Sequence, residues 1–200
     1  MIEKCDADVF WDYYLSIEDD LYKTVGYVEP CEDNYDTYSQ VYAKVINVAC
    51  AEIDVIFKEI CKTVDTDYKP NGKNENINVY RTIVIEKYPH IEQANLRVDR
   101  SKIDIYPFKG WSDTGKLFWW KDYQKIKHER QGYYTKANLK NAIYSVGALR
   151  ILELYYLRIH AKDKYILANK DGPFFKTRYT RPVMFLSDNV DLPDFVAIEN

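Results

Sequence analysis

A histidine among cationic side chains is the clearest candidate for chemistry in this sequence. If the segment after the paired tryptophans is a helix, residues at steps of three and four positions share one ridge. Cations near an imidazole favour its neutral form, which is the form that a general base requires. The segment therefore predicts a phosphate-binding site with three candidate catalytic residues, His128, Lys121 and Arg130. Its candidate phosphate contacts are Lys121, Gln124, Lys125, Lys127 and Arg130.

The other side of this predicted helix carries Trp119, Tyr123 and Ile126, which would anchor it to a core. The alternative is that the ridge is an ordinary solvated helix face on which one of three histidines lies. The remaining histidines indicate structural roles. His90 lies in a predicted loop, and His160 lies at a predicted helix end, where a cation is favoured.

Other reactive patterns are absent from the sequence. It has no glycine-rich phosphate loop, zinc-protease motif, serine-hydrolase motif or calcium-binding loop. Glu18, Asp19 and Asp20 are adjacent, and adjacent positions on a helix point in different directions, so they indicate a solvated face rather than a metal cluster. We therefore expect no metal and no cofactor.

The four cysteines, Cys5, Cys31, Cys50 and Cys61, have no metal-ligand spacing. Cys50 and Cys61 are about three helical turns apart, too far for a disulfide, so buried free thiols are expected. The chain has no basic and apolar leader pattern at its start and no run near the roughly 18 apolar residues of a membrane span. These features predict a cytoplasmic protein with no membrane partner.

Hydrophobic periodicity predicts the elements that must position the histidine ridge. Alternating residues around the turn 99–102 predict a small hairpin of residues 96–98 and 103–105. Segments 181–186 and 194–198 indicate short strands or an extended tail. The predicted helices span residues 8–22, 37–64, 77–88, about 116–130 and about 135–160.

Local signals suggest where these helices begin and end. Thr37, with Gln40 three residues later, matches a capping box for the second helix. Asp113 is a candidate cap for the helix over about 116–130, and Gly132 is expected to interrupt it. Residues 148–159 are apolar almost all round, which predicts the central helix of a bundle.

Length and composition favour one mainly α domain over residues 1–200. The helical core would span about 8–160, and an extended or β C-terminal extension about 172–200. Nineteen tyrosines predict many half-buried rings. The net charge is −3, yet residues 100–140 hold ten Lys or Arg against four acids, whereas residues 1–36 are strongly acidic. A basic surface is one interpretation, and mutual neutralisation of the two regions is the other.

This order of elements resembles the HEPN superfamily. Its members are helical bundles, commonly dimers, and many are metal-independent ribonucleases of toxin, antiphage and RNA-processing systems, whereas others are non-catalytic. Their motif is an arginine, a polar residue and, after four to six intervening positions, a histidine. The resemblance covers roughly residues 37–64 and 116–160. Residues 127–130 also look like segments of uncharacterised bacterial proteins.

Gln124 and His128 match the polar residue and the histidine of that motif, and Tyr123 stands where the family has arginine. Lys121, Lys127 or Arg130 would have to supply the missing cation. The resemblance implies that the histidine takes the proton of an RNA 2′-hydroxyl while a cation stabilises the phosphorane. It also implies a homodimer that brings two such helices together.

Three functional hypotheses follow. The first is a HEPN-like bacterial protein of a defence or toxin–antitoxin setting that binds RNA through the histidine ridge, with metal-independent cleavage left open. The second is a non-catalytic scaffold or dimerisation module with the same bundle. The third is a small-ligand pocket lined by tyrosines, whose position no motif indicates.

Overall fold

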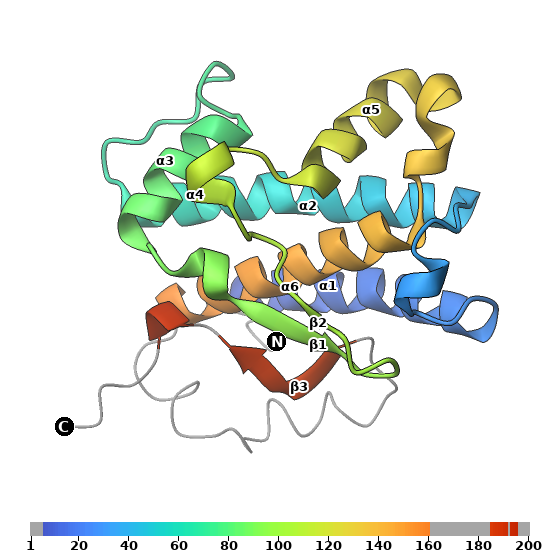
Figure 1. The fold of residues 1–200 in the computed structure, drawn as a ribbon. Coiled ribbons are helices and arrows are strands. Elements are labelled where there is room, and N and C mark those ends of the chain that lie inside the picture. Colours follow the sequence, from blue (N-terminus) through green and yellow to red (C-terminus); the bar gives the residue numbers. More distant parts are fainter. Residues whose placement is uncertain (1–5, 161–184, 192, 196–200) are drawn as a thin grey trace, which may run out of the picture.

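The computed structural model describes residues 6–160, 185–191 and 193–195, and these are mainly helical, as predicted (Figure 1). Six α-helices and a small sheet form the described part. The predicted helix over 77–88 is confirmed within one residue of each end. The helices are α1 (Asp6–Tyr22), α2 (Gln40–Val64), α3 (Ile77–Lys87), α4 (Trp111–Thr114), α5 (Phe118–Tyr133) and α6 (Leu139–His160).

Helices α2 and α6 run side by side in the same direction and form the centre of the bundle. Their starts are joined where Ser39 N–H donates to Ala137 O at 3.0 Å and Leu139 N–H donates to Thr37 O at 2.9 Å. Their ends also meet, with Thr63 Oγ1 and His160 Nε2 3.5 Å apart. Figure 1 shows α6 between α2 and α1, and α3, α4 and α5 beyond α2.

The prediction that the last long helix is central is confirmed. Most α6 side chains from Leu139 to Leu157 are buried, because the helix packs against α1, α2 and α5. An α-helix that is apolar around its circumference needs neighbours on every side. The aromatic core continues beside it, where the Phe57 ring lies 5.4 Å from those of both Tyr80 and Trp111.

The predicted capping box of α2 is wrong by two residues. Ser39 is the N-cap, and its Oγ accepts a hydrogen bond from Tyr42 N–H at 3.1 Å. Thr37 instead lies before the helix, and its carbonyl oxygen accepts a hydrogen bond from Leu139 N–H at the start of α6. Both residue types can cap a helix, and the pairing between the two helix starts decides which one does.

Two predicted boundaries of the α5 region are also wrong. Asp113 does not cap α5, because it lies inside the short helix α4. The N-cap of α5 is Leu117, which makes no side-chain capping bond. Gly132 does not interrupt α5 either. The backbone departs from helical geometry at Glu129, with φ −138° and ψ 47°.

The predicted hairpin is confirmed and carries a third strand. Strand β1 (Asn95–Val98) pairs antiparallel with β2 (Asp104–Ile105) and with β3 (Phe185–Asp191), in the order β2-β1-β3. The strand predicted over 181–186 begins at Phe185 in the described part, and residues 181–184 lie outside it. Of the predicted segment 194–198, the described residues belong to the 3-10 turn Pro193–Phe195.

Asp194 joins this last turn to the bundle. Its Oδ2 accepts from the Tyr155 hydroxyl at 2.7 Å, and its Oδ1 accepts from His90 N–H at 3.1 Å. The C-terminal segment that contains it is therefore tied both to α6 and to the loop before β1. His90 has a structural position here, as its loop placement predicted.

The cysteine prediction is confirmed for two thiols. Cys50 and Cys61 are buried and free, and burial raises the pKa of the Cys61 thiol to about 12. Cys5 lies outside the described residues. Among the helices that the structure describes, none has the length and apolar character that a bilayer crossing demands.

Candidate functional site

Helix α5 places the histidine ridge on the outside of the molecule. Trp119, Tyr123 and Ile126 are buried against the bundle, as the spacing predicts. Lys121 and His128 are exposed on the opposite side, and Gln124 lies between them, partly exposed. The imidazole is therefore accessible to a solute, which a histidine packed in the core would not be.

Two contacts fix the start and the middle of α5. The indole Nε1 of Trp119 donates to the carbonyl of Pro107 at 2.8 Å. One helical turn later, Asp122 Oδ2 accepts from Asn141 Nδ2 of α6 at 3.2 Å. Both acceptors satisfy donors that would be costly to bury alone, so these bonds orient the helix as well as attach it.

Asp122 also divides the cations of the segment into two groups. Lys125 Nζ lies 3.8 Å from its carboxylate, and Lys136 Nζ lies 3.9 Å away. Lys125 also lies 4.8 Å from the centre of the Tyr133 ring. These two lysines are partly occupied by the fold, so they are weaker candidates for a phosphate than the sequence suggests.

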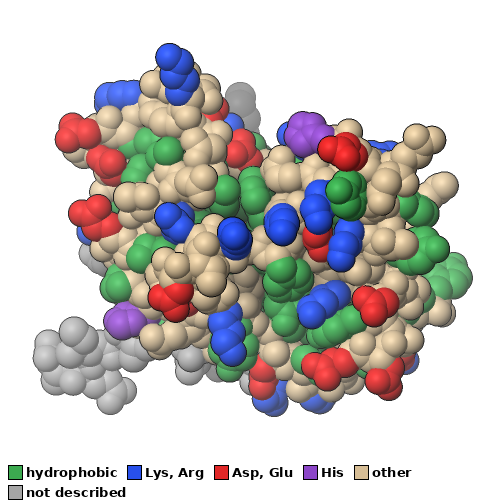
Figure 2. All heavy atoms as spheres, turned by 45° about the horizontal axis from the view of Figure 1, so that its top comes forward, with side chains coloured by type: hydrophobic (Ala, Val, Ile, Leu, Met, Phe, Trp, Pro, Cys, Tyr) green, Lys and Arg blue, Asp and Glu red, His purple; other side chains and the backbone are tan. Residues whose placement is uncertain are grey.

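The second group is free of such ion pairing. Lys121, Lys127 and Arg130 are exposed, and in residues 6–160 no carboxylate lies within ion-pair distance of them. Lys127 Nζ lies 5.6 Å from the centre of the Tyr123 ring, so Lys121 and Arg130 are the less engaged of the three. Figure 2 shows this side of the molecule, where Lys and Arg side chains form a band with few acidic side chains inside it. A cationic band of this kind on an acidic protein is an attractive surface for a polyanion.

The break at Glu129 separates Arg130 from the helical ridge. Positions before the break keep the three- and four-residue spacing, so Lys121, Gln124, Lys125 and His128 share one side of α5. Arg130 follows the non-helical residue, two positions after His128. It is therefore a candidate phosphate contact beside the ridge and does not share the ridge with His128.

His128 lacks a partner that would orient its ring within the described residues. A general base is normally held by a second group that selects its tautomer and direction. The position of the family's arginine is Tyr123, whose side chain is only 5% exposed and faces the bundle. The position is therefore filled by a buried ring, which offers no cation beside His128.

A cavity of about 320 Å³ opens where α5 begins. Its wall is built from the segment after β2, the start of α5 and one residue of α6, which are brought together by the Trp119–Pro107 bond. Sequence reasoning missed it because its residues are up to 38 positions apart. The lining residues are Tyr106, Pro107, Lys109, Lys116, Leu117, Phe118 and Tyr144.

Two half-exposed rings and two lysines give this cavity its chemistry. Phe118 is 42% exposed and Tyr106 is 40% exposed. Phe118 meets Tyr144 edge to face, with ring centres 4.8 Å apart, and Lys140 Nζ lies 5.2 Å from the Phe118 ring centre. Burial raises the pKa of the Tyr144 hydroxyl above its ordinary value of 10.0.

Gly115 explains how the chain reaches this wall. It ends α4 with φ +65°, a conformation that side chains disfavour, and a Cβ there would collide with the guanidinium of Arg81. The glycine therefore lets Lys116 and Leu117 turn into α5 at this point.

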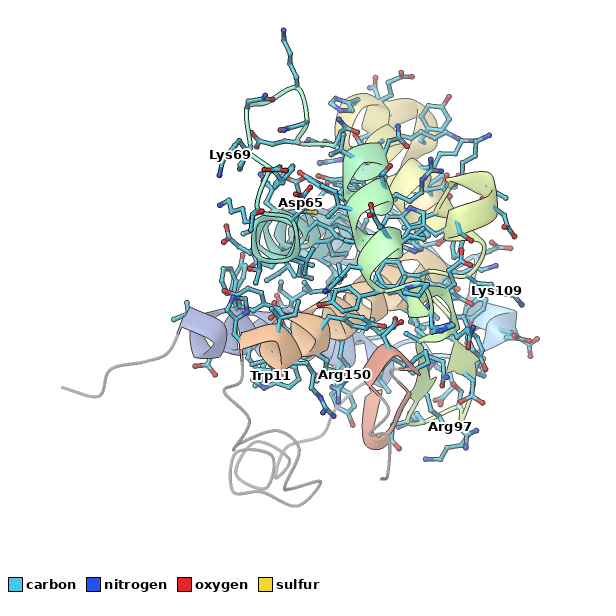
Figure 3. All side chains as sticks on the ribbon, turned by 90° about the vertical axis from the view of Figure 1, so that its left-hand side faces the viewer. Trp11, Asp65, Lys69, Arg97, Lys109 and Arg150 are labelled. Atoms are coloured by element: carbon cyan, nitrogen blue, oxygen red, sulfur yellow. The ribbon has the colours of Figure 1, made fainter. Side chains whose placement is uncertain are left out.

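In Figure 3, Lys109 lies at the outer edge of the molecule, away from Trp11 and Arg150.

Comparison with protein-family models, curated proteins and solved structures gave no match.

Proposed function

We propose that the protein binds RNA through the exposed side of α5. The carrying observation is the set of exposed cations in the described part that have no carboxylate partner there, Lys121, Lys127 and Arg130. Lysines and arginines without internal ion-pair partners release bound counterions when they contact phosphates, and this release drives nucleic-acid binding. Gln124 and His128 add further hydrogen-bonding groups next to Lys121 on the ridge.

The geometry favours a single strand over a compact anion. From Phe118 to His128 the ridge rises ten residues, a length of about 15 Å. A single phosphate would occupy one end of it, whereas a strand can follow it. Exposed aromatic rings at the start of the ridge are the usual partners of unstacked bases.

RNA cleavage requires more of this surface than RNA binding does. The chemistry would need His128 to take a 2′-hydroxyl proton and a cation to stabilise the phosphorane. His128 has no orienting partner in the described part, and Tyr123 is turned inward where the arginine would stand. These two observations support binding without cleavage.

The test is a titration of labelled single-stranded RNA by fluorescence anisotropy at several salt concentrations. The variant Lys121→Gln/Lys127→Gln should bind more weakly at every salt concentration. Its log affinity should also depend less on log salt, by about 0.7 for each phosphate that the variant no longer neutralises. Incubation of the wild type and His128→Ala with RNA in chelator should leave the RNA intact in both cases.

The matched control is Lys44→Gln/Lys87→Gln, which removes two exposed lysines from α2 and α3. It should keep the wild-type affinity and salt slope. Equal weakening by both double variants would mean that overall charge, not the α5 surface, determines binding. Cleavage that disappears in His128→Ala would replace the binding-only proposal with the ribonuclease one.

A second candidate function is a self-associating scaffold. Val41, Val48 and Val55 follow one another at seven-residue steps on α2, and Val41 and Val55 are 49% and 37% exposed. Seven-residue spacing keeps apolar side chains in one row, as in paired helices. Both charge signs flank the row, with Lys44 and Glu59 near its ends, so a second copy could pair with it antiparallel without net repulsion.

A further inference from the structure

We propose that the cavity at the start of α5 holds one unstacked base of the bound RNA strand, with an adjacent phosphate on Lys109 and Lys116. The proposal rests on the RNA-binding function and names the part of the strand that the cavity selects. It assigns separate tasks to two neighbouring surfaces. The α5 ridge contacts the backbone, and the cavity takes a base.

The size of the cavity fits one nucleotide unit. Its volume of about 320 Å³ is at the small end of the range for ligand sites, about 300–1,000 Å³. Its floor is apolar because Pro107 and Leu117 are buried there. An apolar floor with a polar rim suits a flat heterocycle with its polar edge outward.

The two exposed rings supply the surfaces on which a base stacks. Tyr106 and Phe118 line the same cavity, and each keeps about two-fifths of its surface in contact with solvent. Stacking on an aromatic face tolerates any base, since every base has a π-face. The Tyr144 ring belongs to the same wall and packs against the edge of Phe118.

The lysines distinguish this ligand from simpler ones. Lys109 and Lys116 are exposed at the rim, and the described residues place no carboxylate within ion-pair distance of either. An uncharged apolar ligand would not use them, and a free inorganic phosphate would not use the rings. A base joined to a phosphate uses both sets of groups.

Continuity with the α5 ridge indicates a strand rather than a free nucleotide. Phe118 begins α5, and Lys121 lies one turn further along the same exposed side, three residues on. A strand whose base occupies the cavity can therefore continue onto the ridge. A base inside a duplex cannot enter the cavity unless it leaves its stack, so single strands should be preferred.

The experiment compares an eight-nucleotide single-stranded RNA with the same RNA carrying one abasic position, moved along the strand. For the wild type, one abasic position should weaken binding by roughly 5- to 150-fold, the range for removing one base from an aromatic stack. Phe118→Ala should weaken binding of the intact RNA by a similar factor. The affinity of this variant should no longer depend on whether that position is abasic. Phe118→Trp should restore the sensitivity.

Two further variants keep the test independent of folding. Tyr27→Ala removes a ring that is 90% exposed elsewhere on the molecule, and it should leave RNA affinity unchanged. Circular dichroism checks that Lys109→Gln/Lys116→Gln is folded. This variant should bind the single strand more weakly and should distinguish it less well from duplex RNA.

The outcomes separate this proposal from the RNA-binding function. If no abasic position changes the affinity and Phe118→Ala binds like the wild type, the cavity proposal is overturned. Weaker binding by Lys121→Gln/Lys127→Gln would then still support the RNA-binding function. If Phe118→Ala weakens binding and Lys121→Gln/Lys127→Gln does not, the α5 surface fails and the cavity stands. Equal affinity for a nucleoside monophosphate and the octamer would overturn the assignment to a strand.

Discussion

Glu153 is a carboxyl group whose surroundings oppose its charge. It is fully buried on α6, and neither carboxylate oxygen has a hydrogen-bond partner among the described residues. Burial, and then the negative charge of Glu52 on α2, raise the pKa of Glu153 from 4.5 to about 9. The folded protein therefore keeps a proton that the unfolded chain releases above about pH 4.5. Its free energy of unfolding should fall as pH rises through this window.

Replacing Glu153 with glutamine should remove this pH dependence. The variant should gain stability relative to the wild type as pH rises from about 5 to about 9, by up to about 1.4 kcal/mol per pH unit. Urea unfolding followed by circular dichroism across this range measures the difference. Glu86→Gln, on the exposed side of α3, is the control and should track the wild type. If the free energies of unfolding of Glu153→Gln and the wild type differ by the same amount at every pH, the raised pKa of Glu153 is contradicted.

Among the elements, helix α5 is attached to the bundle at its start and middle and exposes its outer side to solvent. Its first turn is fixed by the Trp119 bond to Pro107, and its middle by the Asp122 bond to Asn141. At Glu129 the backbone leaves helical geometry, and α5 continues after this kink to Tyr133. The part before the kink therefore carries the start of the cavity wall and the ridge, while Arg130 lies after it.

The start of α2 leads to a prediction about helix capping. Ser39→Ala removes the acceptor for Tyr42 N–H and should lower the free energy of unfolding by about 1 kcal/mol. Thr37→Ala removes the residue that the sequence pattern favours, yet its side chain caps nothing in the structure, so it should change stability much less. Thermal unfolding of both variants measures this. A larger loss for Thr37→Ala would mean that the helix begins two residues earlier than Gln40.

At the scale of the whole molecule, the acidic and basic regions do not neutralise each other across the described residues. One ion pair joins them there, between Glu29 and Arg100 with 2.7 Å between Oε1 and Nε. The α5 cations remain on the side of the molecule seen in Figure 2. A protein of net charge −3 can therefore still present a basic band.

The valine row on α2 leads to a prediction about assembly. If it mediates self-association, sedimentation equilibrium should give twice the chain mass of 23.7 kDa for the wild type. Val41→Gln/Val55→Gln should shift the protein to a single chain without weakening RNA binding, because glutamine removes apolar surface and adds no charge. Val9→Gln, an exposed valine on α1, is the control. A wild-type protein that stays monomeric at high concentration would exclude this scaffold model.

The sequence by itself determined the positions of the long helices, the hairpin and the buried character of α6. These features depend on residues within a few positions of each other, and apolar spacing records them directly. It also identified the exposed side of α5, because the same spacing that buries Trp119 and Ile126 turns Lys121 and His128 outward.

Contacts between distant segments select which candidate groups are available and what lies beside them. Asp122 engages Lys125 and Lys136, and Tyr123 is held inside where an arginine was sought. The choice of Ser39 over Thr37 as a cap and the cavity between Tyr106, Phe118 and Tyr144 also arise from segments distant in sequence. Ion pairs, caps and cavities depend on distances between such segments, and a local pattern contains no information about those distances.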